Sequence, residues 1–148
     1  MLVIEDDIDT ARLIRSMLER KLSARVDVAN DCASARLALA ACTYDVVTLD
    51  YQLPDCDGLD MLDEITAQPD HPPVVMITGR GDEELANLSF RMGASGYAVK
   101  EKNLSVMLIQ AIEWALADTA TKRTLEETLS LVDKLASPVD PTSGKPGR

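Results

Sequence analysis

Charged and oxygen-bearing side chains follow apolar segments at several points along the chain, and together they could hold a phosphoryl group. These residues are Glu5, Asp6, Asp7, Asp50, Thr78 and Lys100. Carboxylates gathered at one place repel one another and favour a bound cation, and ligand sets made of oxygen alone favour Mg²⁺ or Mn²⁺. A divalent ion, a hydroxyl and an ammonium would neutralise phosphoryl oxygens, so Asp50 is a candidate nucleophile that forms an acyl phosphate.

Apolar segments rich in β-branched residues precede most of these side chains and predict strands buried on both faces of a parallel sheet. The predicted strands are residues 2–4, 26–29, 46–49, 74–77 and 97–99. Helical spacing predicts helices between them, with starts at Asp9–Thr10, Asp31, Gly58, Asp82 and Asn103–Leu104. This alternation predicts an α/β fold with a doubly wound sheet, in which the carboxyl ends of the strands form the functional edge.

Composition argues against several classes of function. The net charge of -10 over 148 residues disfavours binding to nucleic acid or to anionic membranes. No apolar segment is long enough to cross a bilayer and no signal-peptide pattern is present, so we expect a cytoplasmic protein. Cys32, Cys42 and Cys56 lack metal-ligand spacing, and their odd number without a secretory signal predicts reduced thiols. His71 alone cannot supply a histidine-based triad or a histidine-rich metal site.

Four sequence blocks, in order and spacing, resemble the receiver domain of response regulators in two-component signalling. The blocks are LVIEDD, VVTLDYQLPDCDG, VVMITGRGDEE and GASGYAVK. The resemblance covers residues 1–118 and implies a flavodoxin-like, five-stranded parallel sheet in the order 2-1-3-4-5, with helices on both faces.

The resemblance also implies a phosphorylation site and its metal ligands. Asp50 matches the phospho-accepting aspartate of the family. Glu5 and Asp6 match the acidic pair that holds Mg²⁺, with Asp6 the more direct ligand. Asp7 is a weaker match and is expected to cap the first helix instead. The carbonyl of Gln52 would complete the protein ligands of the ion.

Further matches imply a switch. Thr78 matches the hydroxyl that hydrogen-bonds the phosphoryl group, Lys100 the lysine that pairs with it, and Tyr97 the aromatic residue that turns inward when the threonine moves. The implied phosphodonor is a phosphohistidine on a sensor histidine kinase or a histidine phosphotransfer protein. Phosphorylation would then remodel the face formed by the fourth helix, the fifth strand and the fifth helix. Glu101 departs from the family, which usually has proline after the lysine.

Two other functions are compatible with parts of this pattern. A degenerate receiver would act as a docking or dimerisation module without phosphorylation, although the presence of Asp50, Asp6 and Thr78 together with Lys100 argues against this. A Mg²⁺-dependent aspartyl-phosphate phosphatase would carry a second acid two residues after its nucleophile, where this chain has Gln52. We therefore expect a signalling protein rather than an enzyme.

Helical spacing continues beyond the predicted receiver domain. Leu125, Leu129, Val132 and Ala136 follow one another at intervals of four, three and four residues. They predict a helical extension over residues 119–136, which either pairs as a coiled coil in a homodimer or folds back on its own domain. Residues 137–148 are rich in proline and glycine and predict a flexible tail or linker.

Overall fold

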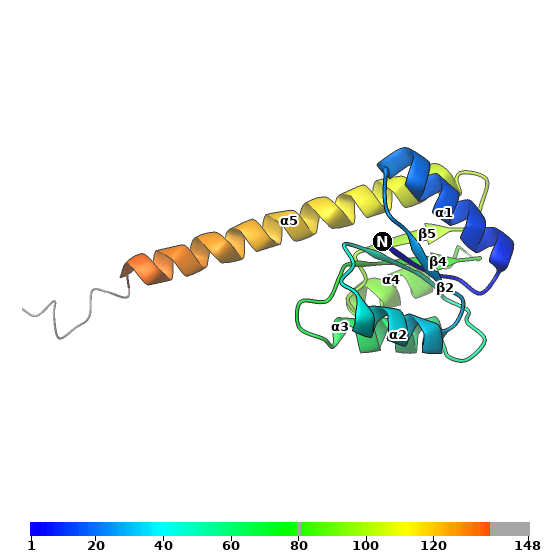
Figure 1. Ribbon diagram of the computed structural model, residues 1–148, viewed down its shortest axis with the longest axis horizontal. Helices are drawn as coiled ribbons and strands as arrows, with labels where there is room; N and C mark the ends of the chain where they lie inside the picture. Colours follow the sequence, from blue (N-terminus) through cyan, green and yellow to red (C-terminus); the bar gives the residue numbers. More distant parts are fainter. Residues whose placement is uncertain (80, 137–148) are drawn as a thin grey trace, which may run out of the picture. The chain divides into compact units, whose positions relative to one another are not determined.

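The structure is a computed structural model that describes residues 1–79 and 81–136. Strands and helices alternate along the chain, as predicted (Figure 1). The elements are β1 (Leu2–Ile4), α1 (Ile8–Leu22), β2 (Asp27–Ala29), α2 (Cys32–Ala41), β3 (Val47–Asp50), α3 (Gly58–Thr66), β4 (Val74–Thr78), α4 (Glu83–Arg91), β5 (Gly96–Val99) and α5 (Leu104–Ala136). The strands form one sheet in the order β2-β1-β3-β4-β5, which confirms the predicted flavodoxin-like fold.

All strand pairs are parallel, so every strand ends at the same edge of the sheet. The register pairs Asp50 at the end of β3 with Ile77, and Thr78 at the end of β4 with Val99. The polar residues that follow these positions are therefore gathered at one edge, as the doubly wound topology requires.

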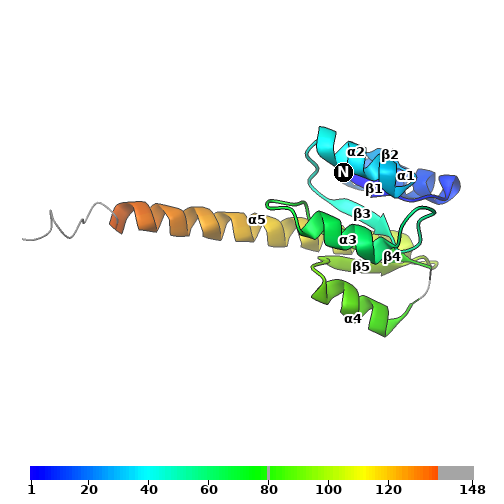
Figure 2. The same ribbon diagram turned by 90° about the horizontal axis from the view of Figure 1, so that it is seen from below.

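Successive strand residues pack on opposite faces of the sheet, because side chains alternate along a strand. Leu2 and Ile4 pack in a core with α2 and α3, whereas Val3 packs in a second core with α1 and the first turns of α5. Figures 1 and 2 show α1 on one side of the sheet and α2 and α3 on the other. Both faces are buried, which explains why the strands are almost uniformly apolar.

Helix starts follow the capping residues, with one correction. The side chain of Asp31 accepts a hydrogen bond from the Ser34 amide, and that of Asp82 accepts one from the Glu84 amide, so both predicted caps are confirmed. The predicted start of the first helix at Asp9–Thr10 is wrong, whereas the expectation that Asp7 precedes this helix as its cap residue is right: α1 begins at Ile8 after an extended Asp7, whose side chain makes no capping hydrogen bond to an amide of the described residues. The carboxylate of Asp7 accepts a hydrogen bond from the Thr10 hydroxyl, which lowers the pKa of Asp7.

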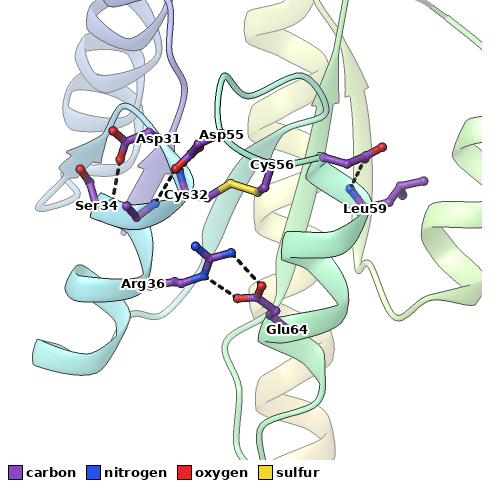
Figure 3. Close-up of a disulfide and its surroundings, with 10 residues drawn as sticks. Asp31, Cys32, Ser34, Arg36, Asp55, Cys56, Leu59 and Glu64 are labelled. Atoms are coloured by element: carbon purple, nitrogen blue, oxygen red, sulfur yellow. Dashed lines mark hydrogen bonds and ion pairs between the residues drawn. A yellow bond between two sulfur atoms is a disulfide. The ribbon is translucent and has the colours of Figure 1, made fainter.

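The prediction that all three cysteines are reduced is wrong for two of them. Cys32 and Cys56 form a disulfide whose Cα atoms are 6.2 Å apart (Figure 3). Cys42 is free and exposed. The pair was missed because the fold, rather than the spacing along the chain, brings the start of α2 against the loop that follows β3.

The chain divides into two compact units, residues 1–116 and a second unit that begins at Ala117. In the second unit the described residues, 117–136, are the later part of α5, which ends at Ala136. The predicted tail over 137–148 lies outside the described residues. Within the described part of the chain, no helix combines the length and apolar character that crossing a membrane requires.

Candidate functional site

Backbone hydrogen bonds of the sheet position the residues at its carboxyl edge. Glu5 follows β1, and its amide donates to the carbonyl of Ala29 at 2.9 Å. Lys100 follows β5, and its amide donates to the carbonyl of Thr78 at 2.8 Å. Residues far apart in sequence thus hold fixed positions at one edge of a rigid sheet.

Three carboxylates meet at this edge. One oxygen each of Glu5, Asp6 and Asp50 lies within 4.8 Å of the others. Glu5 and Asp50 are buried, with 1% and 4% of their surface exposed, whereas Asp6 is exposed. Burial, the largest cause, and the neighbouring Asp50 raise the pKa of Glu5, Lys100 acts in the opposite direction, and the net effect is a pKa of about 7. The cluster therefore has an affinity for positive charge.

The ammonium of Lys100 lies against two of these acids. Nζ of Lys100 is 2.7 Å from Oε1 of Glu5 and 3.3 Å from Oδ2 of Asp50. Burial alone lowers the pKa of Lys100, but its contacts with the two carboxylates outweigh this and raise it. The contact with Glu5 is an ion pair only, since Oε1 accepts no hydrogen bond of good geometry from the described residues. Lys100 thus contacts two of the three clustered carboxylates.

The loop after β3 is tightly closed around Asp50. The amide of Gln52 donates to Oδ1 of Asp50 at 3.3 Å, and the amide of Gly58 donates to the carbonyl of Tyr51 at 2.8 Å. A Cβ atom on Gly58 would lie 2.6 Å from the carbonyl oxygen of Asp50 and from two backbone atoms of Tyr51. Glycine is required at this position because of this close approach, and it keeps Gln52 next to Asp50.

Thr78 and Tyr97 lie on neighbouring strands at the other side of the site. Thr78 is buried at the end of β4, and Tyr97 is half-buried on β5. The Tyr97 hydroxyl donates to the carbonyl of Asp82 at 3.5 Å, and burial raises the pKa of Tyr97. A cavity of about 580 Å³ opens beside Thr78; its lining includes Gln52, Asp82, Leu85 and Leu88. There is room beside Thr78 for a side chain to move.

A parallel sheet with acids and an ammonium at its carboxyl edge is the arrangement that the family resemblance led us to expect. Residues 1–113 match the family model described as the response regulator receiver domain, and the chain belongs to this family. The family belongs to two-component signal transduction, whose receivers are signalling proteins rather than classical enzymes and accept phosphate from histidine kinases.

Relatives with known names and structures agree with this assignment. The chain is 31% identical over 100 residues to the transcriptional regulatory protein ResD of Bacillus subtilis, covering 68% of this chain and 41% of that protein. It is 34% identical over 103 residues to the transcriptional regulatory protein CpxR of Klebsiella pneumoniae, covering 70% and 43%. The structure matches the receiver domain of NtrX from Brucella abortus with a TM-score of 0.71 at 34% identity, covering 78% of this chain and 97% of that one. The chain therefore spans less than half the length of these two curated relatives.

The structure brings most of the predicted site residues together, and it adds two features. Glu5, Asp6 and Asp50 converge with Lys100, while the individual roles of these residues stay predictions. The ion pair between Lys100 and Glu5 was not foreseen, because nothing in the local sequence of either residue indicates its partner. The disulfide between Cys32 and Cys56 was also missed. The only feature of the sequence that could have suggested it was the presence of Cys56 in the loop after Asp50.

Proposed function

We propose that the chain is a phosphorylation-switched receiver that takes a phosphoryl group onto Asp50. The donor is a phosphohistidine on a sensor histidine kinase or a histidine phosphotransfer protein. A carboxylate oxygen of Asp50 attacks phosphorus, the P–N bond to the imidazole breaks, and its electron pair returns to the ring nitrogen, which then takes up a proton. Little covalent machinery is needed beyond the nucleophile, so positioning and charge neutralisation carry the catalysis.

The carboxylate cluster fits a divalent cation. The donor set of Glu5, Asp6 and Asp50 consists of oxygens alone, as Mg²⁺ prefers, and one oxygen of each lies within 4.8 Å of the others. In our proposal these side chains and the carbonyl of Gln52 hold Mg²⁺, which would neutralise phosphoryl charge when bound. Lys100 moves from its contacts with the acids to pair with the phosphoryl oxygens.

A phosphoryl group on Asp50 would then change the neighbouring strands. Its oxygens are strong hydrogen-bond acceptors, and the Thr78 hydroxyl is a donor at the next strand end. In our proposal Thr78 moves toward the phosphoryl group and Tyr97 turns into the space beside it. The surface of α4, β5 and α5 thereby changes, and a partner or an attached output domain detects this change. The transcriptional roles named for ResD and CpxR support an attached output, since this chain spans 41% and 43% of those proteins.

The observation that carries the proposal is the convergence of Asp50 with two further acids and one ammonium at the strand ends. The test is incubation with acetyl phosphate or phosphoramidate and Mg²⁺, followed by intact mass measurement. The parent should gain one phosphoryl group, whereas Asp50→Asn and the parent in EDTA should stay unmodified. An unmodified parent would favour the alternative of a phosphate-independent docking module, and equal labelling of Asp50→Asn would refute the assignment of the nucleophile.

We further propose that residues 117–136 pair with a second copy of the chain. Their apolar side chains lie at coiled-coil spacing and are more than half exposed; they include Leu125, Leu129 and Val132. In sedimentation equilibrium the parent should therefore be dimeric at a concentration at which Leu129→Asp is monomeric. The control Glu127→Asp, which keeps the charge at an exposed position of the same helix, should behave as the parent. A parent that stays monomeric up to millimolar concentration would contradict this proposal.

A further inference from the structure

The disulfide between Cys32 and Cys56 joins the start of α2 to the loop that follows Asp50. Cys32 is the first residue of α2, and Cys56 lies in the loop that leads from Asp50 to α3 (Figure 3). Cys32 is fully buried, whereas Cys56 is half-buried. The more accessible sulfur is therefore on the loop that also carries Gln52.

The carboxylate of Asp55 keeps the two cysteines close together independently of the disulfide bond. Oδ1 of Asp55 accepts a hydrogen bond from the Cys32 amide at 2.8 Å, and Oδ2 accepts one from the Ala33 amide at 3.0 Å. These amides are unpaired donors of the first turn of α2, so the loop acts as a cap for that helix. With the disulfide reduced, this cap would still keep both thiols within reach of each other.

The remainder of α2 is anchored separately. Arg36 in α2 makes two contacts of 2.8 Å with Glu64 in α3, one from each of two guanidinium nitrogens. Reduction would therefore leave the helix in place and remove one of the two links between its first turn and the loop, the other being the contact of Asp55. The loop begins after Asp50 and includes Gln52, whose amide donates to the Asp50 carboxylate.

We propose that Cys32 and Cys56 are a reversible thiol–disulfide site whose redox state controls how readily Asp50 is phosphorylated; this rests on the proposed function. The oxidant is a peroxide. The Cys56 thiolate attacks one oxygen of hydrogen peroxide, the O–O bond breaks, and a sulfenic acid and a hydroxide ion form; the hydroxide takes up the proton that the Cys56 thiol had released, which gives one water. The Cys32 sulfur then attacks the sulfenic sulfur, the S–O bond breaks, and a second water leaves with the proton of Cys32. Two thiols lose two electrons in total, and a dithiol reductant reverses the step through a mixed disulfide.

The disulfide should favour phosphorylation because it pre-organises the loop. A nucleophile reacts faster when the groups that surround it are already in position. The disulfide is a second link between the loop and α2, besides the contact of Asp55. We expect the oxidised protein to be phosphorylated several-fold faster than the reduced protein, because a loss of positioning around the nucleophile slows the reaction.

The test uses a Cys42→Ser background, in which the exposed third thiol cannot react. Peroxide titration followed by alkylation and peptide mass mapping should show joint loss of the Cys32 and Cys56 thiols as one cross-link, reversed by dithiothreitol. Retention of one zinc ion per reduced chain, with protection from peroxide, would overturn the proposal by making Cys32, Asp55 and Cys56 a metal site.

The functional arm compares phosphorylation by acetyl phosphate with Mg²⁺ in the two redox states. Equal rates, or a faster reduced protein, would overturn the control of Asp50. Cys56→Ser should behave as the reduced protein with or without peroxide. Hydrogen exchange of residues 51–57, which should be slower in the oxidised protein, provides a readout that needs no phosphorylation. If neither redox state is phosphorylated, the proposed function of Asp50 fails, and exchange alone then decides whether the disulfide orders the loop.

Discussion

Replacement of Gly58 by alanine tests how closely the loop is folded against the phosphorylation site. The added Cβ would lie 2.6 Å from the Asp50 carbonyl oxygen and from the Cα and carbonyl oxygen of Tyr51. All three are backbone atoms and cannot turn aside as a flexible side chain would. Overpacking lowers the free energy of unfolding by about 1–3 kcal/mol, and we expect a loss of about 3 kcal/mol from three simultaneous close contacts.

A partial gain opposes this cost. Gly58 is the first residue of α3, and alanine favours a helix over glycine by up to about 1 kcal/mol. The expected net loss in the free energy of unfolding is about 2 kcal/mol, since the clash exceeds the gain in helix propensity. At roughly 4 °C per kcal/mol for a domain of this size, Tm should fall by about 8 °C.

The assay is urea and thermal unfolding followed by circular dichroism, with Gly79→Ala as the matched control. A Cβ on Gly79 would meet no atom within 4 Å, so this variant should stay within about 0.5 kcal/mol of the parent. Phosphorylation of Gly58→Ala should also be slower at a temperature where it is folded, because the displaced atoms adjoin Asp50. A Gly58→Ala variant as stable as the parent would refute the close approach.

Two further predictions concern the charges of the site, both measured in EDTA. Lys100→Ala should lower the free energy of unfolding by about 1–3 kcal/mol, because it leaves buried acids unpaired. Added Mg²⁺ should restore part of this loss. The control Lys102→Ala, at an exposed position, should be as stable as the parent. The pKa of Glu5 is raised from 4.5 to about 7, so its contribution to stability is complete below pH 4.5 and is lost as pH rises through 7. Glu5→Gln should therefore lose less free energy of unfolding than the parent between pH 5 and pH 8, as measured by urea unfolding. Parallel plots of this free energy against pH for the two proteins would contradict the raised pKa.

Much of the fold could be predicted because its signals are local. The apolar, β-branched segments fix where strands form, and Asp31 and Asp82 cap their helices through amides two or three residues away. The right-handed connections of an alternating chain then place the strand ends at one edge, so the convergence of acids near Asp50 could be expected before the structure. The start of α1 was misplaced because Asp7 and Asp9 are both suitable capping residues, and the backbone conformation decides between them.

The sequence determined the set of residues at the functional edge through residue type and spacing along the chain, and the strand order followed from the family that those residues resemble. Only the tertiary structure decided which of these residues are partners. The ion pair of Lys100 with Glu5, the disulfide of Cys32 with Cys56 and the approach of Gly58 to Asp50 depend on distances of a few ångströms. Such distances arise from how helices and loops pack on the sheet, and the local sequence of one partner carries no information about the position of the other.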